Sequence, residues 1–101
     1  MIYSDVWDIK LNLENRSLIY KGKNITLTLT EFELLKHLVL NLGKIQTREQ
    51  LLNKLKGFDG DVTDRLIDSY IKRLRQKLDD KAKMIKTVWG LGYIIEKEID
   101  V

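Results

Sequence analysis

A run of basic side chains between Thr63 and Leu78 is the group of residues in this chain best suited to chemistry. Five positive residues fall there against two negative ones, a net charge of +3 that equals the net charge of the whole 101-residue chain. Three of the five are arginines, whose planar forks of N–H donors suit phosphate oxygens and guanine edges. The residue types therefore indicate a surface that binds an anion.

Segment 63–78 predicts a helix with two different faces. At helical spacing, one arc roughly 140° wide is apolar and holds Leu66, Ile67, Ile71, Leu74 and Leu78. The opposite arc is cationic and holds Arg65, Ser69, Lys72, Arg73 and Gln76, flanked by Asp68 and Arg75. A charged face is commonly just a solvated face, but its one-signed charge favours an anion-binding strip. The angle of Tyr70 suits the core as well as a phosphate contact.

Three further regions are needed to position this helix. Alternating apolar residues predict a small antiparallel meander in segments 7–13, 17–21 and 25–29. Two short helices follow, each opened by a capping box, at Thr30–Glu33 and at Thr47–Gln50, and joined through Gly43 as in a helix-turn-helix. After the basic helix, segments 84–88 and 93–95 predict a hairpin whose turn contains two glycines.

Composition excludes several classes of protein. Apolar residues make up 44% and charged residues 33% of the chain, values typical of one small globular domain spanning 1–101. There is no cysteine, and His37 is the single histidine, so thiol chemistry and histidine-based metal sites are excluded. Glu31 and Glu33 are interpreted as capping carboxylates, and Asp59 and Asp61 do not match a calcium loop. We expect no enzyme, metal or cofactor, and the absence of a long apolar segment or signal peptide favours the cytoplasm over a membrane.

Four motifs in order resemble one family. They are Leu29-Thr-Leu-Thr-Glu-Phe-Glu-Leu-Leu, Thr47-Arg-Glu-Gln-Leu-Leu, Asp64-Arg65 followed by Ile71-Lys-Arg-Leu-Arg-Gln-Lys-Leu78, and Ile85-Lys-Thr-Val-Trp-Gly-Leu-Gly-Tyr93. Together they resemble the OmpR/PhoB-type winged helix-turn-helix, the DNA-binding effector domain of bacterial two-component response regulators. The resemblance implies an α+β fold with an N-terminal antiparallel sheet, a three-helix core and a C-terminal hairpin wing.

The resemblance also implies which residues contact double-stranded DNA. The recognition helix, about 63–78, would lie in the major groove, and its DNA-facing positions match Arg65, Ser69, Tyr70, Lys72, Arg73 and Arg75. Arg65 and Arg73 are expected to make the strongest contacts, while Lys72 and Arg75 hold phosphates. The wing, about 84–96, would contact the backbone or minor groove through Thr87, Gly90 and Tyr93.

This chain departs from the family pattern at two positions. Trp89 stands where many members carry a minor-groove arginine, so two roles are open for it: contact with a sugar edge, or packing partly in the core. Lys56 stands where many relatives have a tryptophan, and a lysine could neutralise the same phosphate.

Partners follow from the same resemblance. The loop with Phe58, Asp59 and Asp61 resembles a segment that touches RNA polymerase in some members, although a solvated turn is an equal interpretation. We expect a receiver domain and a sensor kinase in a longer protein from which this chain is excised, a stand-alone regulator being the other possibility. The isolated domain would be monomeric and would bind weakly, and dimerisation would place two copies on tandem half-sites. The alternative function is a winged-helix protein-interaction module whose basic helix binds an acidic partner.

Overall fold

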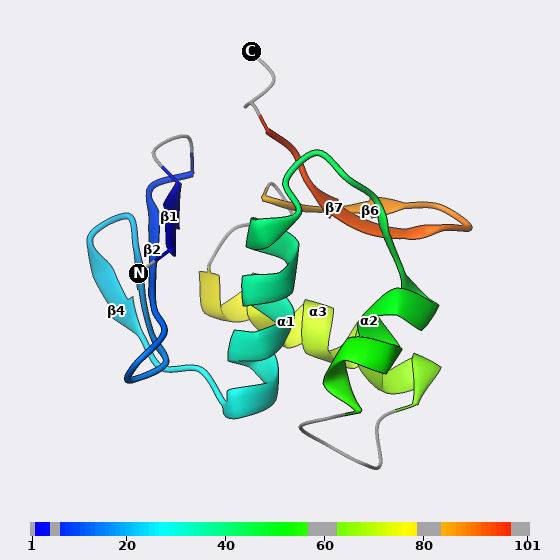
Figure 1. Cartoon of the computed structure of the whole chain (residues 1–101), viewed down its shortest axis with the longest axis horizontal. Coiled ribbons are helices and arrows are strands. Elements are labelled where there is room, and N and C mark those ends of the chain that lie inside the picture. The colour runs from blue at the N-terminus through cyan, green and yellow to red at the C-terminus, as the bar shows by residue number, and fades with distance from the viewer. Residues whose placement is uncertain (1, 5–6, 57–62, 79–83, 98–101) are drawn as a thin grey trace.

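The computed structural model describes residues 2–4, 7–56, 63–78 and 84–97, and these ranges hold three helices between two antiparallel sheets (Figure 1). The N-terminal sheet has the order β1-β2-β3-β4, with bounds Ile2–Ser4, Ile9–Asn12, Ser17–Tyr20 and Lys23–Ile25. The helices are α1 (Leu29–Leu40), α2 (Arg48–Leu55) and α3 (Asp64–Leu78). The second sheet has the order β5-β7-β6, with β5 at Gln46–Thr47, β6 at Ile85–Val88 and β7 at Gly92–Ile95. This arrangement confirms the α+β fold class.

The N-terminal sheet is a meander held by one apolar face. Ile9 and Leu11 of β2 lie beside Leu18 and Tyr20 of β3 in antiparallel register, and all four side chains are buried. The predicted strand at 25–29 is wrong in its extent: β4 ends at Ile25, and Leu29 already belongs to α1. Strand β1, which pairs with β2, was not expected.

The capping box of helix α1 lies two residues before the predicted one. The hydroxyl of Thr28 accepts a hydrogen bond from the Glu31 backbone at 3.2 Å, and the Glu31 carboxylate accepts one from the Thr28 backbone at 2.9 Å. The predicted box at Thr30–Glu33 is therefore wrong. The sequence offers two boxes, because Thr28 and Thr30 each stand three residues before a glutamate. Thr28 is the N-cap, with an extended backbone, and Thr30 already lies inside the helix. Glu33 instead pairs with Lys36 at 2.9 Å. The second box, Thr47–Gln50, is confirmed.

A short strand between α1 and α2 joins the helices to the wing. Gly43, just past the end of α1, has a φ of +76° and donates a backbone hydrogen bond to Ile95 at 2.8 Å. Gln46 and Thr47 then pair with Tyr93 and Gly92 of β7. A Cβ atom on Gly92 would lie 2.1 Å from the Gln46 carbonyl oxygen, so this crossing needs glycine.

Candidate nucleic-acid interface

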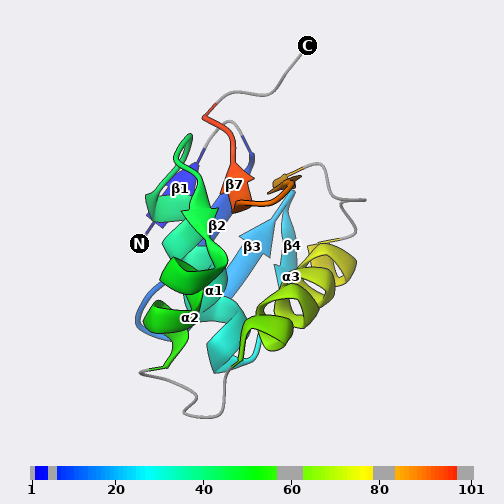
Figure 2. The same ribbon diagram turned by 90° about the vertical axis from the view of Figure 1, so that its right-hand side faces the viewer.

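Helix α3 carries the two faces that its sequence predicts. Ile67, Ile71 and Leu74 are fully buried and pack in the core shared with α1 and α2. The opposite side is exposed and carries Arg65, Ser69, Lys72, Arg73 and Gln76, which we call the α3 basic face. In Figure 2, α3 runs along one side of the molecule.

The cations of the α3 basic face are not neutralised by neighbouring acids. Among the described residues, the side chains of Arg65 and Lys72 form neither an ion pair nor a hydrogen bond. The guanidinium carbon of Arg73 lies 5.7 Å from the centre of the Tyr70 ring, a cation–π distance. Tyr70 itself is only 9% exposed, so it packs in the core and supports Arg73 from beneath.

Arg75 fixes the wing to α3. Its Nε donates to the Ile85 carbonyl at 3.1 Å, and one of its Nη atoms donates to the same oxygen at 2.8 Å and to the Thr87 hydroxyl at 2.9 Å. The resemblance implied that Arg75 contacts a phosphate. In the structure, Arg75 is half-buried and its guanidinium bonds to the wing. These bonds set the orientation of strand β6 against the helix.

Tyr93 lies at the centre of a polar cluster between α2, α3 and β7. Its hydroxyl donates to the Asp68 carboxylate, which also accepts a hydrogen bond from Arg48 Nε at 2.9 Å. The guanidinium groups of Arg48 and Arg75 lie 5.9 and 5.6 Å from the centre of the Tyr93 ring. The resemblance implied that Tyr93 contacts the DNA backbone. Tyr93 is only 4% exposed, however, and its ring packs against Arg48 and Arg75 instead of facing solvent.

The charges in this cluster shift the ionisation of its members. Burial, and then the hydrogen bond to Asp68, raise the pKa of Tyr93 above its ordinary value of 10.0. Burial acts to raise the pKa of Asp68, but the bonds from Tyr93 and Arg48 outweigh it and leave that pKa below 3.8. Asp68 is therefore an anion at neutral pH, and its charge on the flank of α3 is compensated by Arg48.

The sequence did not predict a functional role for Arg48. It is the first residue of α2 and carries a single positive charge in a segment where no cationic pattern stands out. Its partner Asp68 lies twenty residues away, so only the packing of α2 on α3 reveals the pair.

The wing turn leaves a large aromatic side chain in solvent. Trp89 is 89% exposed, which shows that the interpretation of Trp89 as partly core is wrong. Gly90 adopts a φ of +79°, and Leu91 closes the turn with a backbone hydrogen bond to Val88 at 2.9 Å. Trp89 lies in the three-residue turn between Val88 and Gly92, beyond the last paired residues of the hairpin.

Other expected positions lie elsewhere. Phe58, Asp59 and Asp61, the proposed polymerase-contact loop, are outside the described residues. Lys56, at the end of α2, is exposed. No helix in the described part of the chain combines the length and apolarity needed to cross a membrane.

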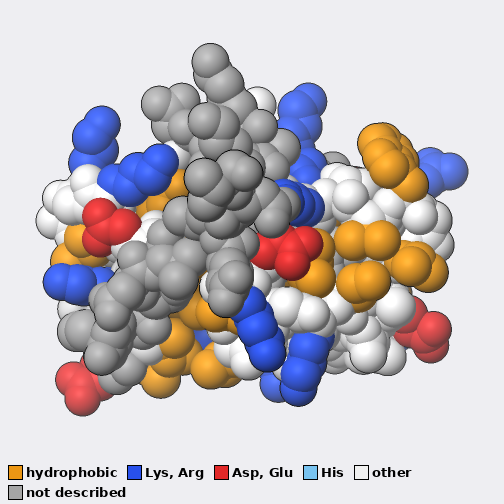
Figure 3. Space-filling model, turned by 90° about the horizontal axis from the view of Figure 1, so that it is seen from above, with side chains coloured by type: hydrophobic (Ala, Val, Ile, Leu, Met, Phe, Trp, Pro, Cys, Tyr) orange, Lys and Arg blue, Asp and Glu red, His pale blue; other side chains and the backbone are white. Residues whose placement is uncertain are grey.

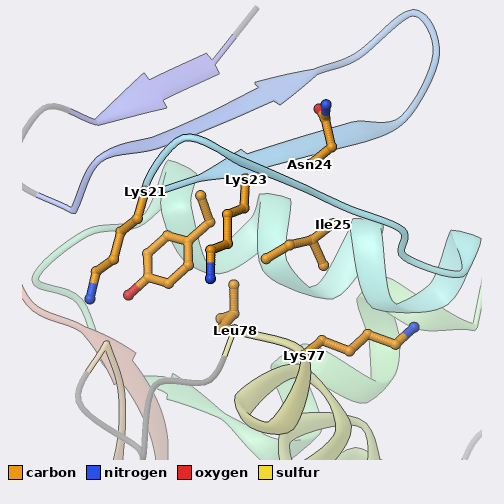
Figure 4. Close-up of a pocket in the computed structure, with 7 residues that line it drawn as sticks. Lys21, Lys23, Asn24, Ile25, Lys77 and Leu78 are labelled. Atoms are coloured by element: carbon orange, nitrogen blue, oxygen red, sulfur yellow. The ribbon is translucent and has the colours of Figure 1, made fainter.

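A hollow of about 300 Å³ lies between the β3–β4 turn and the end of α3 (Figure 4). Three lysines contribute to its lining, Lys21, Lys23 and Lys77. The Lys77 amino group points away from the hollow and pairs with Glu31 of α1. The hollow is thus a seam between the sheet and α3, distinct from the α3 basic face.

The chain is similar to known transcriptional regulators over most of its length. Residues 22–95 match the family described as "Transcriptional regulatory protein, C terminal". Response regulator ArlR of Staphylococcus aureus is 40% identical over 93 residues, which cover 90% of this chain and 42% of ArlR. The chain thus spans about two fifths of the length of these curated relatives.

Solved structures show the same likeness. The Klebsiella pneumoniae RstA DNA-binding domain, crystallised in complex with the RstA box, matches with a TM-score of 0.78 and 35% identity, covering 90% of this chain and 93% of that one. The Thermotoga maritima response regulator DrrB, an OmpR/PhoB homologue, matches with a TM-score of 0.78 and 38% identity, covering 92% of this chain and 43% of that one.

Proposed function

This chain belongs to the family of C-terminal transcriptional regulatory domains, of the OmpR/PhoB winged helix-turn-helix type, and from that premise we propose that it is a response-regulator effector domain that binds double-stranded DNA by sequence. The observation that carries the proposal is the α3 basic face. It combines exposed arginines and a lysine with no acid bonded to Arg65 or Lys72 among the described residues. Such a face suits the major groove, where phosphates line both edges.

Four side chains of the α3 basic face, all but Gln76, have a role that their chemistry supports. Arg65 and Arg73 bind phosphate or the N7 and O6 atoms of guanine, because a guanidinium donates two parallel hydrogen bonds. Lys72 neutralises a phosphate, and Ser69, being short, lets the helix seat deeply. Thr87 and Gly90 meet the sugar-phosphate backbone, and Arg75 and Tyr93 hold the wing at the angle that permits this.

The partners of a longer protein are part of the same proposal. A receiver domain, phosphorylated by a sensor kinase, would bring two effector domains together on tandem half-sites. Matching relatives such as ArlR carry the name response regulator and are more than twice as long as the matched region, which supports this arrangement. The loop with Phe58, Asp59 and Asp61 would then be offered to RNA polymerase, and the protein would act in the cytoplasm.

The test is selection from a pool of random duplexes at moderate salt, followed by sequencing of the retained DNA. We expect enrichment of a short motif, and a log–log slope of affinity against salt of about −4 to −6, from about 0.9 per neutralised phosphate. Repeating the selection with a forced dimer separates a domain that needs its partner from one that does not bind. If neither form enriches any sequence, the α3 basic face serves an acidic protein partner and the proposal fails.

A further inference from the structure

The turn between β3 and β4 carries two lysines for which the proposed function has no use. Lys21 and Gly22 form a two-residue turn between Tyr20 and Lys23, which pair across the hairpin. Lys21 has a φ of +51° and Gly22 one of +79°, and asparagine or aspartate followed by glycine closes such a turn with less strain. The hairpin itself therefore does not explain why lysines stand at both positions.

Both lysines line the hollow between this turn and the end of α3. In Figure 4, the Lys23 side chain extends from the turn towards Leu78, with Lys21 beside it. Ile25 of β4 and the buried Leu78 of α3 add apolar surface to the lining. The volume of about 300 Å³ lies at the lower end of the range for small-molecule sites, roughly 300 to 1,000 Å³. The hollow thus has room for a small organic molecule.

The positive charges of the two turn lysines are not compensated. Both side chains are exposed, and neither forms an ion pair with any described residue. The Lys21 ammonium lies 5.1 Å from the centre of the Tyr20 ring, which is buried and keeps it beside the hollow. The third lysine of the lining, Lys77, is already neutralised by Glu31 at 2.5 Å. Two ammonium groups therefore remain to attract an anion.

These charges lie apart from the α3 basic face. That face is on the exposed side of the helix, whereas Leu78, which borders the hollow, is buried on its apolar side. Figure 3 shows Lys and Arg side chains at the left-hand end of the molecule, the end where the N-terminal sheet lies in Figure 1. A ligand in the hollow does not need a duplex on α3, so the inference goes beyond the proposed function and does not rest on it.

We propose that the hollow binds a small organic phosphate, a phosphate monoester whose carbon part packs on Ile25 and Leu78. Such a group carries a charge of about −1.5 to −2 at neutral pH, which matches the ammonium groups of Lys21 and Lys23. Lysine binds phosphate as a point charge, so two flexible side chains are sufficient to hold it. The ligand contacts the N-terminal sheet and the last turn of α3 together, and it stabilises the folded chain because the unfolded chain has no such site.

Phenyl phosphate is the probe, because it combines the charge with a small apolar body. Titration at constant ionic strength should move the backbone amide signals of residues 21–25 in a saturable way and raise the Tm of the chain. Inorganic phosphate has the charge without the ring, and phenol has the ring without the charge. Each should bind at least about tenfold more weakly than phenyl phosphate.

Substitutions at the turn test the residues. Lys23→Gln and Lys21→Gln should each weaken the binding of phenyl phosphate about tenfold, as the loss of one charge-assisted hydrogen bond should. Both side chains are exposed, so the fold should persist. The matched control is Lys54→Gln, which removes the same charge from an exposed position on α2 and should leave the affinity unchanged.

The outcomes separate this inference from the proposed function. If Lys54→Gln weakens binding as much as Lys23→Gln, the anion is attracted only by the net charge and the inference is wrong. If phenyl phosphate moves no signal of residues 21–25 while Lys21→Gln and Lys23→Gln weaken binding to a selected duplex, the lysines contact DNA; the inference is then wrong and the proposed function stands. If phenyl phosphate binds as expected and no duplex binds at any salt concentration, the proposed function fails and the inference stands.

Discussion

Arg73 and Lys72 are neighbours on the α3 basic face, but their surroundings prepare them for different contacts. The Arg73 guanidinium lies over the buried ring of Tyr70, which restricts its motion before any partner binds. Lys72 has a flexible, compact charge and no bonded partner among the described residues. A guanidinium that is already oriented loses less conformational entropy when it forms paired hydrogen bonds. Arg73 is therefore the better candidate for a hydrogen-bonded contact with a base edge.

Arg73→Ala should weaken binding to the selected site by about 1 to 3 kcal/mol and relax the preference at one base position. Titration of matched and mismatched duplexes measures both effects. Gln76→Ala, an exposed and uncharged position on the same face, serves as the control and should bind normally. An unchanged affinity for Arg73→Ala would remove its assigned role, and an equal loss on every sequence would make it a phosphate contact.

Glu31 is a buried residue whose ionisation contributes to stability. It is 1% exposed, caps α1, and pairs with Lys77 of α3. Burial acts to raise its pKa, but the bonds from Lys77 and Thr28 outweigh burial and leave the pKa below 4.5. Because the pKa is lower in the folded state, its contribution to stability is fully present above 4.5 and is lost as the pH falls through the lowered value.

Glu31→Gln should lower the free energy of unfolding at pH 7 by about 1 to 3 kcal/mol, since a glutamine keeps the capping bond but not the ion pair. The difference between variant and parent should shrink in acid, where the parent carboxylate is protonated as well. Urea denaturation between pH 3 and pH 7 follows both effects. Glu49→Gln, at an exposed position in the first turn of α2, is the control. A difference that stayed constant with pH would show that the ionised carboxylate is not the source of the stability.

At the scale of elements, the junction between α3 and the wing depends on Arg75. Bonds from Arg75 to Ile85 and Thr87 connect the helix to β6, and its guanidinium lies over Tyr93 of β7. One side chain therefore joins the two elements that are proposed to contact DNA, α3 and the wing. A residue with this role acts on affinity through the position of the wing as well as through its charge.

Arg75→Lys separates these two roles, because it keeps the positive charge and cannot reproduce the forked bonds. We expect a loss of about 1 to 3 kcal/mol in unfolding free energy and a weaker affinity for the selected duplex with an unchanged salt slope. Denaturation and duplex titration at several salt concentrations measure the three quantities. Thr87→Val, which removes only one acceptor, should show a smaller effect in the same direction. If Arg75→Lys binds as well as the parent, the phosphate contact is its main role.

At the scale of the whole molecule, the two sheets lie on either side of the helices, and α3 runs across the space between them (Figure 1). The polar cluster of Arg48, Asp68 and Tyr93 joins α2, α3 and β7. In the proposed function, one such domain would contact a single half-site, and its affinity would depend on a second copy being held nearby.

A tethered pair of these chains should therefore bind a tandem site at least about 100-fold more tightly than the single chain, through effective concentration alone. Titration of duplexes with one and with two half-sites gives the comparison. The single half-site is the control, since the tether should bring little advantage there. Equal affinities on both duplexes would show that the two copies cannot engage neighbouring half-sites together.

Patterns within one element were sufficient to predict much of this protein. The two faces of α3 follow from helical spacing, so the α3 basic face and the burial of Ile67, Ile71 and Leu74 were predicted correctly. The meander and the hairpin follow from the alternation of apolar residues and from the turn residues. The predicted end of the third strand was wrong, because β4 ends at Ile25 and Thr28 caps α1. Family motifs then identified the fold and the class of protein.

Only the tertiary structure decided what the wing and the flanks of α3 do. The sequence determined which side chains are charged and which face of a helix they share, because those depend on near neighbours. The partners of Tyr93, Arg75 and Glu31 lie 25, 10 and 46 residues away, in elements whose approach depends on core packing. The exposure of Trp89 also depends on long-range packing, because a distant element could have covered the turn. No element in the described part of the chain covers it. Long-range packing, which no local period encodes, thus separates the arginines that hold the structure together from those left free to bind.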